Sequence, residues 1–224
     1  MKSAKIAEIF ESFQGEGIYL GEKQVFIRFF GCNLACSFCD TPLSHFKEYT
    51  PEALRQEILN YQNYHSLCLT GGEPLCQADF LRDFLENIRD LKIKTYLETN
   101  GTLVDELTKV IDFVDIIAMD FKLPSSCQCG SFWQQHEDFL KCALQKEIFI
   151  KMVIAHRTQE GDIFRARDII KRIKPDVSLV LQPDWFDMNS LLLDKMVSFK
   201  REFSEFGIRD VRILPQAHKL AQIR

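Results

Sequence analysis

The chain has 224 residues, a length typical of one domain with a sizeable core. Apolar residues make up 46% of it and charged residues 27%, as in ordinary globular proteins, and the net charge of −4 argues against a nucleic-acid-binding surface. The first residues lead into a strand-like segment rather than an apolar signal core, and no apolar run approaches transmembrane length. Eight cysteines without a secretory signal favour free thiols in a reducing cytoplasm over disulfides.

Strand-like and helix-like segments alternate along the chain. The expected strands are residues 5–10, 24–30, 66–69, 95–98, 115–119, 148–153, 177–181 and 210–214. The expected helices are residues 51–61, a segment carrying Phe80, Phe84, Leu85 and Ile88 at helical spacing, and residues 103–112, 131–145, 161–173 and 188–206. This alternation predicts a parallel sheet with right-handed crossovers. Six strand–helix units are two short of a closed eight-stranded barrel.

Three cysteines follow the second expected strand at C-x3-C-x2-C spacing: Cys32, Cys36 and Cys39. Three thiolates on one short loop hold three irons of a [4Fe–4S] cluster and leave the fourth iron open. A structural zinc site needs a fourth ligand close by, and the next candidate, His45, lies six residues beyond Cys39. A zinc loop that borrows a distant ligand, or a chance grouping of thiols, stays open as an alternative.

Polar clusters stand where later strands are expected to end. They are Thr70-Gly71-Gly72-Glu73-Pro74, Glu98-Thr99-Asn100-Gly101, Asp120-Phe121-Lys122 and Gln182-Pro183. Each cluster alone is a common strand-to-helix turn. Because open α/β sheets and barrels bind ligands at the carboxyl ends of their strands, we expect these clusters to share one site.

The cysteine spacing, with Phe38 before the last cysteine, resembles the radical S-adenosylmethionine superfamily. Residues 11–17 (ESFQGEG), 26–28 (FIR) and 39–41 (CDT) further resemble the 7-carboxy-7-deazaguanine synthases. The superfamily resemblance extends over most of the chain; the family resemblance rests mainly on the first 45 residues and the last ten. It implies a single-domain α/β fold, a six-unit partial parallel β/α barrel open on one side. The implied parts are a substrate-binding strand and loop (1–23), the barrel (24–206), and a last strand with a substrate-covering tail (207–224).

For cofactors, the resemblance implies one [4Fe–4S] cluster on Cys32, Cys36 and Cys39, S-adenosylmethionine, and Mg²⁺ at Thr41. The implied cofactor-binding residues are Phe38, Gly72, Glu73, Asn100, Lys122 and Gln182, with Gly72 and Glu73 at the amino group of S-adenosylmethionine. Relatives often have Ser-Pro-Lys where this chain has Asp120-Phe121-Lys122, so no role carries over to Asp120. No catalytic side chain is implied beyond the cluster and the adenosyl radical.

For the substrate, the resemblance implies a pterin. The amide of Gln14 and the carboxylate of Glu16 suit the donor and acceptor edge of a pterin, although a polar hairpin loop is the simpler interpretation. Arg28 lies inside an apolar strand, so it either pairs with an internal carboxylate or points toward a substrate carboxylate; the resemblance favours the second. The implied substrate-binding residues are Phe13, Gln14, Gly15, Glu16, Arg28, Thr70, His218 and Arg224, the last through its terminal carboxylate.

The implied reaction is that of a carbon–nitrogen lyase. It converts 6-carboxy-5,6,7,8-tetrahydropterin to 7-carboxy-7-deazaguanine with loss of ammonia, for queuosine-type 7-deazapurines, through a 5′-deoxyadenosyl radical. Two alternatives remain: an activase of a glycyl-radical enzyme, and a non-catalytic iron–sulfur or zinc-binding module. The expected partners are the small-molecule substrate, an electron donor such as flavodoxin or ferredoxin, and a second copy in a homodimer, with neither nucleic acid nor membrane. The expected location is the cytoplasm.

Overall fold

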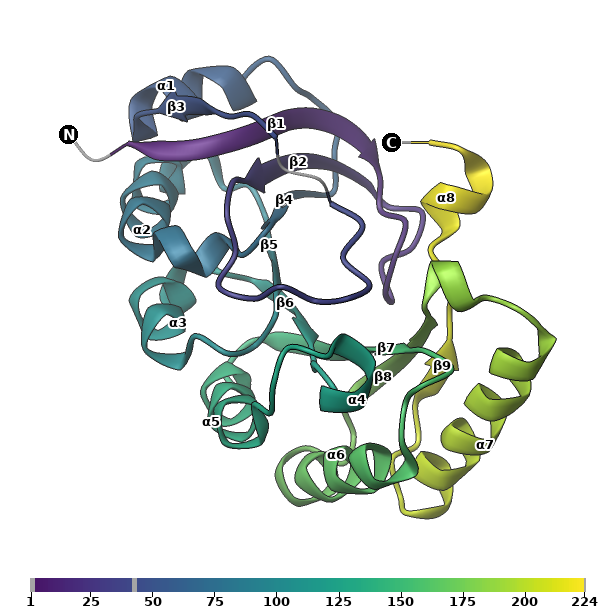
Figure 1. The fold of residues 1–224 in the computed structure, drawn as a ribbon. Helices are drawn as coiled ribbons and strands as arrows, with labels where there is room; N and C mark the ends of the chain where they lie inside the picture. The colour runs from purple at the N-terminus through teal and green to yellow at the C-terminus, as the bar shows by residue number, and fades with distance from the viewer. Residues whose placement is uncertain (1–2, 42–43, 224) are drawn as a thin grey trace.

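A computed structural model describes residues 3–41 and 44–223. Its strands form one curved sheet in the order β3-β1-β2-β4-β5-β6-β7-β8-β9, with the longer helices on the outer face (Figure 1). The strands are β1 (Ala4–Phe13), β2 (Lys23–Phe29), β3 (Lys47–Tyr49), β4 (Ser66–Gly71), β5 (Thr95–Thr99), β6 (Ile116–Asp120), β7 (Glu147–Ile154), β8 (Ser178–Pro183) and β9 (Val211–Ile213). From β2 through β9, omitting β3, neighbouring strands are parallel, whereas β1 is antiparallel to β2 and β3.

The helices lie between the strands as the alternation predicts. The α-helices are α1 (Pro51–Ile58), α2 (Ala78–Asn87), α3 (Val104–Val110), α4 (Pro124–Cys127), α5 (Trp133–Ala143), α6 (Glu160–Ile173), α7 (Ser190–Glu205) and α8 (Ala217–Ala221). Short 3-10 turns are η1 (Pro74–Gln77), η2 (Arg89–Leu91), η3 (Ile111–Phe113) and η4 (Trp185–Asp187). The first helix begins as its sequence indicates: Thr50 caps it by accepting a hydrogen bond from the backbone N–H of Ala53 at 3.2 Å.

The partial barrel is confirmed. Six parallel strands, β2 and β4 to β8, are each followed by a helix, and β9 adds a seventh parallel strand without closing the sheet. The elements that the sequence did not predict are short: β3, α4 and α8 have three to five residues. Segments of that length are too short to show a helical or strand period. Within residues 3–41 and 44–223, no helix is long and apolar enough to cross a membrane.

The inward side chains of the strands form two layers. The layer farther from the carboxyl ends of the parallel strands is apolar and consists of Phe10, Phe26, Cys68, Tyr96, Ile116, Ala118, Phe149 and Val180. Toward the carboxyl ends lies a polar layer of Arg28, Thr70, Glu98, Asp120, Lys151 and Gln182, which line a cavity. The strand registers pair Arg28 with Thr70 and Asp120 with Lys151. Since side chains alternate along a strand, the same pattern that builds the apolar floor also points these polar groups inward.

The loop after β1, residues 14–22, lies across the barrel interior against β7. Tyr19 hydrogen-bonds to Glu147, Gly17 packs on the ring of Phe149, and Glu16 pairs with Lys151. A Cβ at Gly17 would lie 2.5 Å from Phe149 Cζ, and its φ is +69°, so both space and backbone require glycine there. The three β7 partners are spaced by two residues and therefore share the inward face. The loop thus brings the N-terminal segment to the far wall of the barrel.

Candidate active site

A cavity of about 560 Å³ opens at the carboxyl ends of the parallel strands. The predicted site residues that line it are Phe13, Gln14, Gly15, Glu16, Arg28, Cys32, Cys36, Phe38, Cys39, Thr41, Thr70, Gly72, Asn100, Lys122, Gln182 and His218. Glu73 is not among the lining residues, and Arg224 lies outside the described part of the chain. The structure therefore brings together, in one chamber, residues that are as much as 205 positions apart, from Phe13 to His218.

The cysteine loop is held over the cavity at two points. Near its start, the side chain of Asn33 donates to Thr102 at 2.9 Å and accepts from the amide of Asn100 at 2.8 Å. Farther along, the backbone N–H of Ser37 donates to the carbonyl of Cys127 at 2.8 Å, and Arg157 donates to the Ser37 hydroxyl at 2.6 Å. These anchors join the loop after β2 to the segments that follow β5, β6 and β7.

The donor set suits an iron–sulfur cluster. Cys32, Cys36 and Cys39 are free thiols that line the cavity. In the described part of the chain, no three Cys, His, Asp or Glu side chains converge closely enough to hold a single metal ion. Three thiols on one loop suit a [4Fe–4S] cluster by their number, because each thiolate ligates a different iron, whereas a structural zinc site takes four protein ligands.

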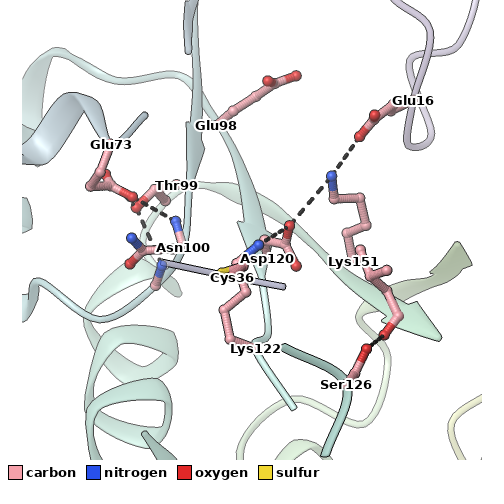
Figure 2. Close-up of polar contacts among 12 residues, drawn as sticks. Glu16, Cys36, Glu73, Glu98, Thr99, Asn100, Asp120, Lys122, Ser126 and Lys151 are labelled. Carbon is pink, nitrogen blue, oxygen red and sulfur yellow. Dashed lines mark hydrogen bonds and ion pairs between the residues drawn. The ribbon is translucent and has the colours of Figure 1, made fainter. Parts of the chain in front are cut away.

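Glu73 holds a strand end behind the cavity wall. Its carboxylate accepts hydrogen bonds from the Thr99 hydroxyl at 2.9 Å and from the backbone N–H of Asn100 at 2.7 Å (Figure 2). It also accepts one from the backbone N–H of Leu75 at 3.1 Å. Burial raises its pKa to about 7 in spite of these donors. The predicted contact between Glu73 and S-adenosylmethionine stays a prediction. In this structure the carboxylate positions Asn100, which does line the cavity.

Four alternating charges cross the cavity. Lys122 Nζ lies 2.7 Å from Asp120 Oδ2, Lys151 Nζ lies 3.4 Å from the same oxygen, and Lys151 Nζ lies 2.5 Å from Glu16 Oε2 (Figure 2). Burial alone would raise the pKa values of Glu16 and Asp120, but the neighbouring ammonium groups hold both below their usual range. The carboxylates are therefore kept ionised inside the chamber.

Gln14 belongs to a second buried hydrogen-bond group. Its side-chain N–H groups donate to Gln24 Oε1 at 3.0 Å and to Glu98 Oε1 at 2.9 Å, and its Oε1 accepts from the backbone N–H of Glu16 at 3.0 Å. The Thr70 hydroxyl donates to the other oxygen of Glu98 at 2.5 Å. Both N–H groups of Gln14 are thus already used within the protein, and its oxygen and both oxygens of Glu98 each already accept one hydrogen bond.

Arg28 pairs with an internal carboxylate and also lines the cavity. Its Nε lies 3.1 Å from Glu8 Oε2, so it pairs with an internal carboxylate on β1. The side chain also lines the cavity, where its guanidinium lies 5.6 Å from the centroid of the Phe10 ring. Its contact with a substrate carboxylate stays a prediction.

The C-terminal segment covers one side of the chamber. The side-chain amide of Gln216 donates to Glu16 Oε1 at 2.7 Å and to Asp40 Oδ2 at 3.0 Å. The backbone N–H of Ala217 donates to the carbonyl of Gly15 at 2.9 Å. His218 packs so closely on Gly15 that a Cβ there would lie 2.2 Å from Nδ1 of His218. The tail is therefore fixed to both the N-terminal loop and the cysteine loop.

Sequence reasoning missed several lining residues, and some carried a usable signal. Lys151 is the single charged residue of the apolar run 148–153, the same signal that singled out Arg28, whereas Glu98 was named in a strand-end cluster but given no role. Asp40, Gln216 and Lys219 lie in irregular or short segments, where no period indicates which side chains point inward.

Comparison with known proteins decides the family. The profile of the Radical SAM superfamily matches residues 26–125. A 7-carboxy-7-deazaguanine synthase of Geobacter sulfurreducens is 36% identical over 96% of this chain and 96% of its own length. One from Thermoplasma acidophilum is 34% identical over 96% of the chain and 95% of its own length. The chain belongs to the 7-carboxy-7-deazaguanine synthase family. The recognition made from the cysteine loop and the N-terminal motifs is thereby confirmed.

The fold of this family member is also that of solved structures. The crystal structure of QueE from Escherichia coli superposes with a TM-score of 0.65, covering 96% of this chain and 95% of that one at 18% identity. A structure of TYW1 with a lysine–pyruvate adduct covers 81% of this chain with a TM-score of 0.60 at 15% identity.

The residues that line the cavity of this 7-carboxy-7-deazaguanine synthase homologue fall into two groups, inside and outside the range matched by the superfamily profile. Residues 26–125 include the cysteine loop, Gly72, Asn100 and Lys122. The loop with Glu16, the strand with Lys151, and the tail with His218 lie outside the matched range. The part shared across the superfamily thus carries all of the predicted cofactor residues except Gln182, and the remainder carries most of the predicted substrate residues.

Proposed function

We propose that this chain converts 6-carboxy-5,6,7,8-tetrahydropterin to 7-carboxy-7-deazaguanine with loss of ammonia, using a [4Fe–4S] cluster, S-adenosylmethionine and Mg²⁺. The observation that carries the proposal is the composition of one chamber. The cysteine loop meets an N-terminal loop and a C-terminal tail whose polar groups suit a pterin. Family membership across 96% of the chain supports the same reaction.

The cofactor side would be formed by the cysteine loop and the ends of β4 to β8. When bound, the cluster and S-adenosylmethionine supply the radical that removes a hydrogen atom from the substrate. Asp120 Oδ1 and Gln182 Oε1 are buried without a hydrogen-bond partner among the described residues, although both side chains line the cavity. Because unpaired buried acceptors are costly, they suit a ligand that brings hydroxyl or amino donors, as S-adenosylmethionine does.

The substrate side would be formed by Gln14, Glu16, Glu98, Arg28 and the tail. The carboxylates of Glu16 and Glu98 would accept N–H groups of the pterin, and Arg28 would face its carboxylate. His218 and Gln216 would shield the bound ring from water, since the tail lies over the N-terminal loop. The acidic net charge agrees with a small-molecule substrate. The terminal carboxylate of Arg224 remains part of the proposal.

Magnesium would bind at Thr41, which lines the cavity next to the cysteine loop, with its hydroxyl 3.4 Å from Asp40 Oδ1. Mg²⁺ takes few protein ligands and completes its octahedron with water or substrate oxygens, so one hydroxyl beside a bound substrate carboxylate suffices. We infer Mg²⁺ here from the family motif at residues 39–41 and from this position.

The wider setting is also proposed. A flavodoxin or ferredoxin would supply the electron, and the enzyme would work in the cytoplasm as a homodimer. Leu193 and Val197 lie one helical turn apart on α7 and are exposed, as residues at a contact between copies would be in the separated chain. Light scattering on the purified protein measures the mass directly.

Turnover of the tetrahydropterin tests the function. Purified protein, reconstituted with iron and sulfide under strict anaerobiosis, is given S-adenosylmethionine, Mg²⁺, a reductant and the pterin, and the product is identified by mass spectrometry. Formation of 7-carboxy-7-deazaguanine supports the proposal. About four irons with labile sulfide per chain fit the cluster, whereas one zinc per chain would identify a zinc-binding module. Reductive cleavage of S-adenosylmethionine without pterin turnover would favour an activase.

A further inference from the structure

We propose that Lys151 is a positioning residue for pterin binding: it holds the carboxylate of Glu16 in place from across the barrel. This inference rests on the proposed function, because it takes the pterin as the ligand of Glu16. Neither the resemblance nor the polar motifs at the strand ends pointed to Lys151. The residue stands in the middle of β7, outside the range matched by the superfamily profile.

The geometry places Lys151 between two acids that come from opposite sides of the chamber. Its Nζ lies 2.5 Å from Glu16 Oε2 and 3.4 Å from Asp120 Oδ2. Asp120 is also paired with Lys122 at 2.7 Å. Glu16, in contrast, has Lys151 as its sole ammonium partner among the described residues. The side chains of Lys151 and Glu16 are 18% and 19% exposed, and water therefore screens the pair only weakly.

Glu16 needs such a partner because, among the described residues, only Gln216 also hydrogen-bonds to its carboxylate. It lies between Gly15 and Gly17, two residues without side chains to pack. Its second oxygen accepts from Gln216 at 2.7 Å, a bond that belongs to the tail. Without the ammonium, a carboxylate in this chamber would lose its counter-charge and either take up a proton or turn toward water. In either case it would no longer present a fixed, ionised acceptor to the N–H groups of a pterin.

The charge pattern also explains why Lys151 is specific to the pterin side. If it is removed, Asp120 keeps Lys122, whereas Glu16 keeps the neutral amide of Gln216 and the more distant imidazole of His218 but no ammonium partner among the described residues. Loss of Lys151 therefore weakens pterin binding and leaves the Lys122–Asp120 pair, on the proposed S-adenosylmethionine side, in place. A residue with a merely structural role would weaken both ligands together.

The test measures binding without turnover. Reconstituted enzyme without reductant is titrated anaerobically with 6-carboxypterin, a stable oxidised analogue, by fluorescence, and with S-adenosylmethionine by calorimetry. Lys151→Met is expected to lower the affinity for 6-carboxypterin by about tenfold or more and the affinity for S-adenosylmethionine by less than about twofold. Lys151→Arg retains the cation and is expected to recover most of the pterin affinity. Lys94→Met, on the exposed segment before β5, is the matched control and should change neither constant.

A double variant keeps the test decisive if Lys151→Met does not fold. Lys151→Met with Glu16→Gln removes both charges at once and is compared with Glu16→Gln alone. Equal affinities within about twofold show that Lys151 acts through Glu16. A further large loss in the double variant, an unchanged pterin constant in Lys151→Met, or equal losses for both ligands would overturn the inference. Wild-type enzyme that neither binds 6-carboxypterin nor turns over the tetrahydropterin would instead refute the proposed function.

Discussion

Lys219, in the C-terminal helix α8, forms an ion pair with Asp40, the residue directly after the third cysteine of the loop. Gln216 donates to the same carboxylate at 3.0 Å. Burial alone would raise the pKa of Asp40, but the hydrogen bonds from Lys219 and Gln216 hold it below its usual range. The end of the chain is thus fixed to the loop that carries the predicted cluster ligands, and tail and loop form one wall of the chamber.

Shortening the tail should therefore weaken the binding of the pterin substrate more than the binding of S-adenosylmethionine. Backbone hydrogen bonds from Gln222 to Lys219 and from Ile223 to His218 close the last turn. Deletion of residues 222–224, or a C-terminal affinity tag, is expected to raise KM for the tetrahydropterin by about tenfold, because the ring loses part of its enclosure. KM for S-adenosylmethionine should change little. The same tag at the N-terminus is the control, and unchanged constants in the truncated enzyme would exclude the tail from the site.

A methyl group at Gly15 should separate the tail from the N-terminal loop. The Cβ of Gly15→Ala would lie 2.2 Å from His218 Nδ1, so the histidine must move away. We expect a higher KM for the pterin with normal iron content, since the cysteines are not touched. Gly161→Ala is the matched control, because a Cβ at Gly161 meets nothing within 4 Å. Equal pterin constants in the two variants would show that His218 does not depend on this contact.

The sequence predicted the barrel and its strand-end clusters better than the contacts of the N-terminal loop and the tail, for a physical reason. The barrel follows from long alternating strands and helices, and the strand-end clusters follow from parallel topology. The pairing of Glu16 with Lys151 spans 135 positions and depends on how far a loop reaches across the interior. The spacing of apolar and polar residues in the sequence does not show how far a loop extends across the interior. Glu73 shows the same limit: its motif indicated a ligand contact, whereas burial and three internal donors are properties of the folded chain.

Single replacement of Cys32, Cys36 or Cys39 by Ala should abolish cluster assembly and turnover, because each thiolate ligates one iron. Cys68→Ala should keep about four irons per chain after reconstitution, since Cys68 is fully buried in the apolar floor of the barrel. Cys129→Ala is a stricter control, because its Sγ lies 3.7 Å from that of Cys36. Iron analysis and the visible spectrum report the result. Loss of iron in Cys129→Ala together with full loading of Cys36→Ala would reassign the ligand.

Turnover should depend on magnesium, and Thr41→Ala should weaken that dependence while the cluster still assembles. The hydroxyl of Thr41 lines the cavity, and its removal takes away one oxygen ligand without altering a cysteine. The measurement is the rate at increasing Mg²⁺, compared with Thr41→Ser, which retains the hydroxyl. Equal rates in the wild type with and without a magnesium chelator would contradict the assignment.

His136 should set part of the acid limit of stability. It is fully buried on α5, with its ring 4.3 Å from that of Phe121, and burial lowers its pKa to about 4. Nearby Asp120 favours the protonated ring and Lys122 opposes it, but burial dominates. The unfolded chain, with an ordinary histidine pKa near 6.5, binds the proton first as pH falls. The contribution of His136 to the free energy of unfolding is therefore fully present above about pH 6.5 and is lost progressively as the pH falls to about pH 4.

The expected size of this loss can be measured by anaerobic urea unfolding. Between pH 7 and about pH 5, His136 should account for about 2 kcal/mol of the decrease in the free energy of unfolding. His136→Phe keeps an aromatic ring beside Phe121 but cannot titrate, so its stability should fall less over that interval. His156→Phe, at an exposed position, should retain the wild-type slope. If His136→Phe and the wild type lose equal stability between the two pH values, the buried imidazole is not the group responsible.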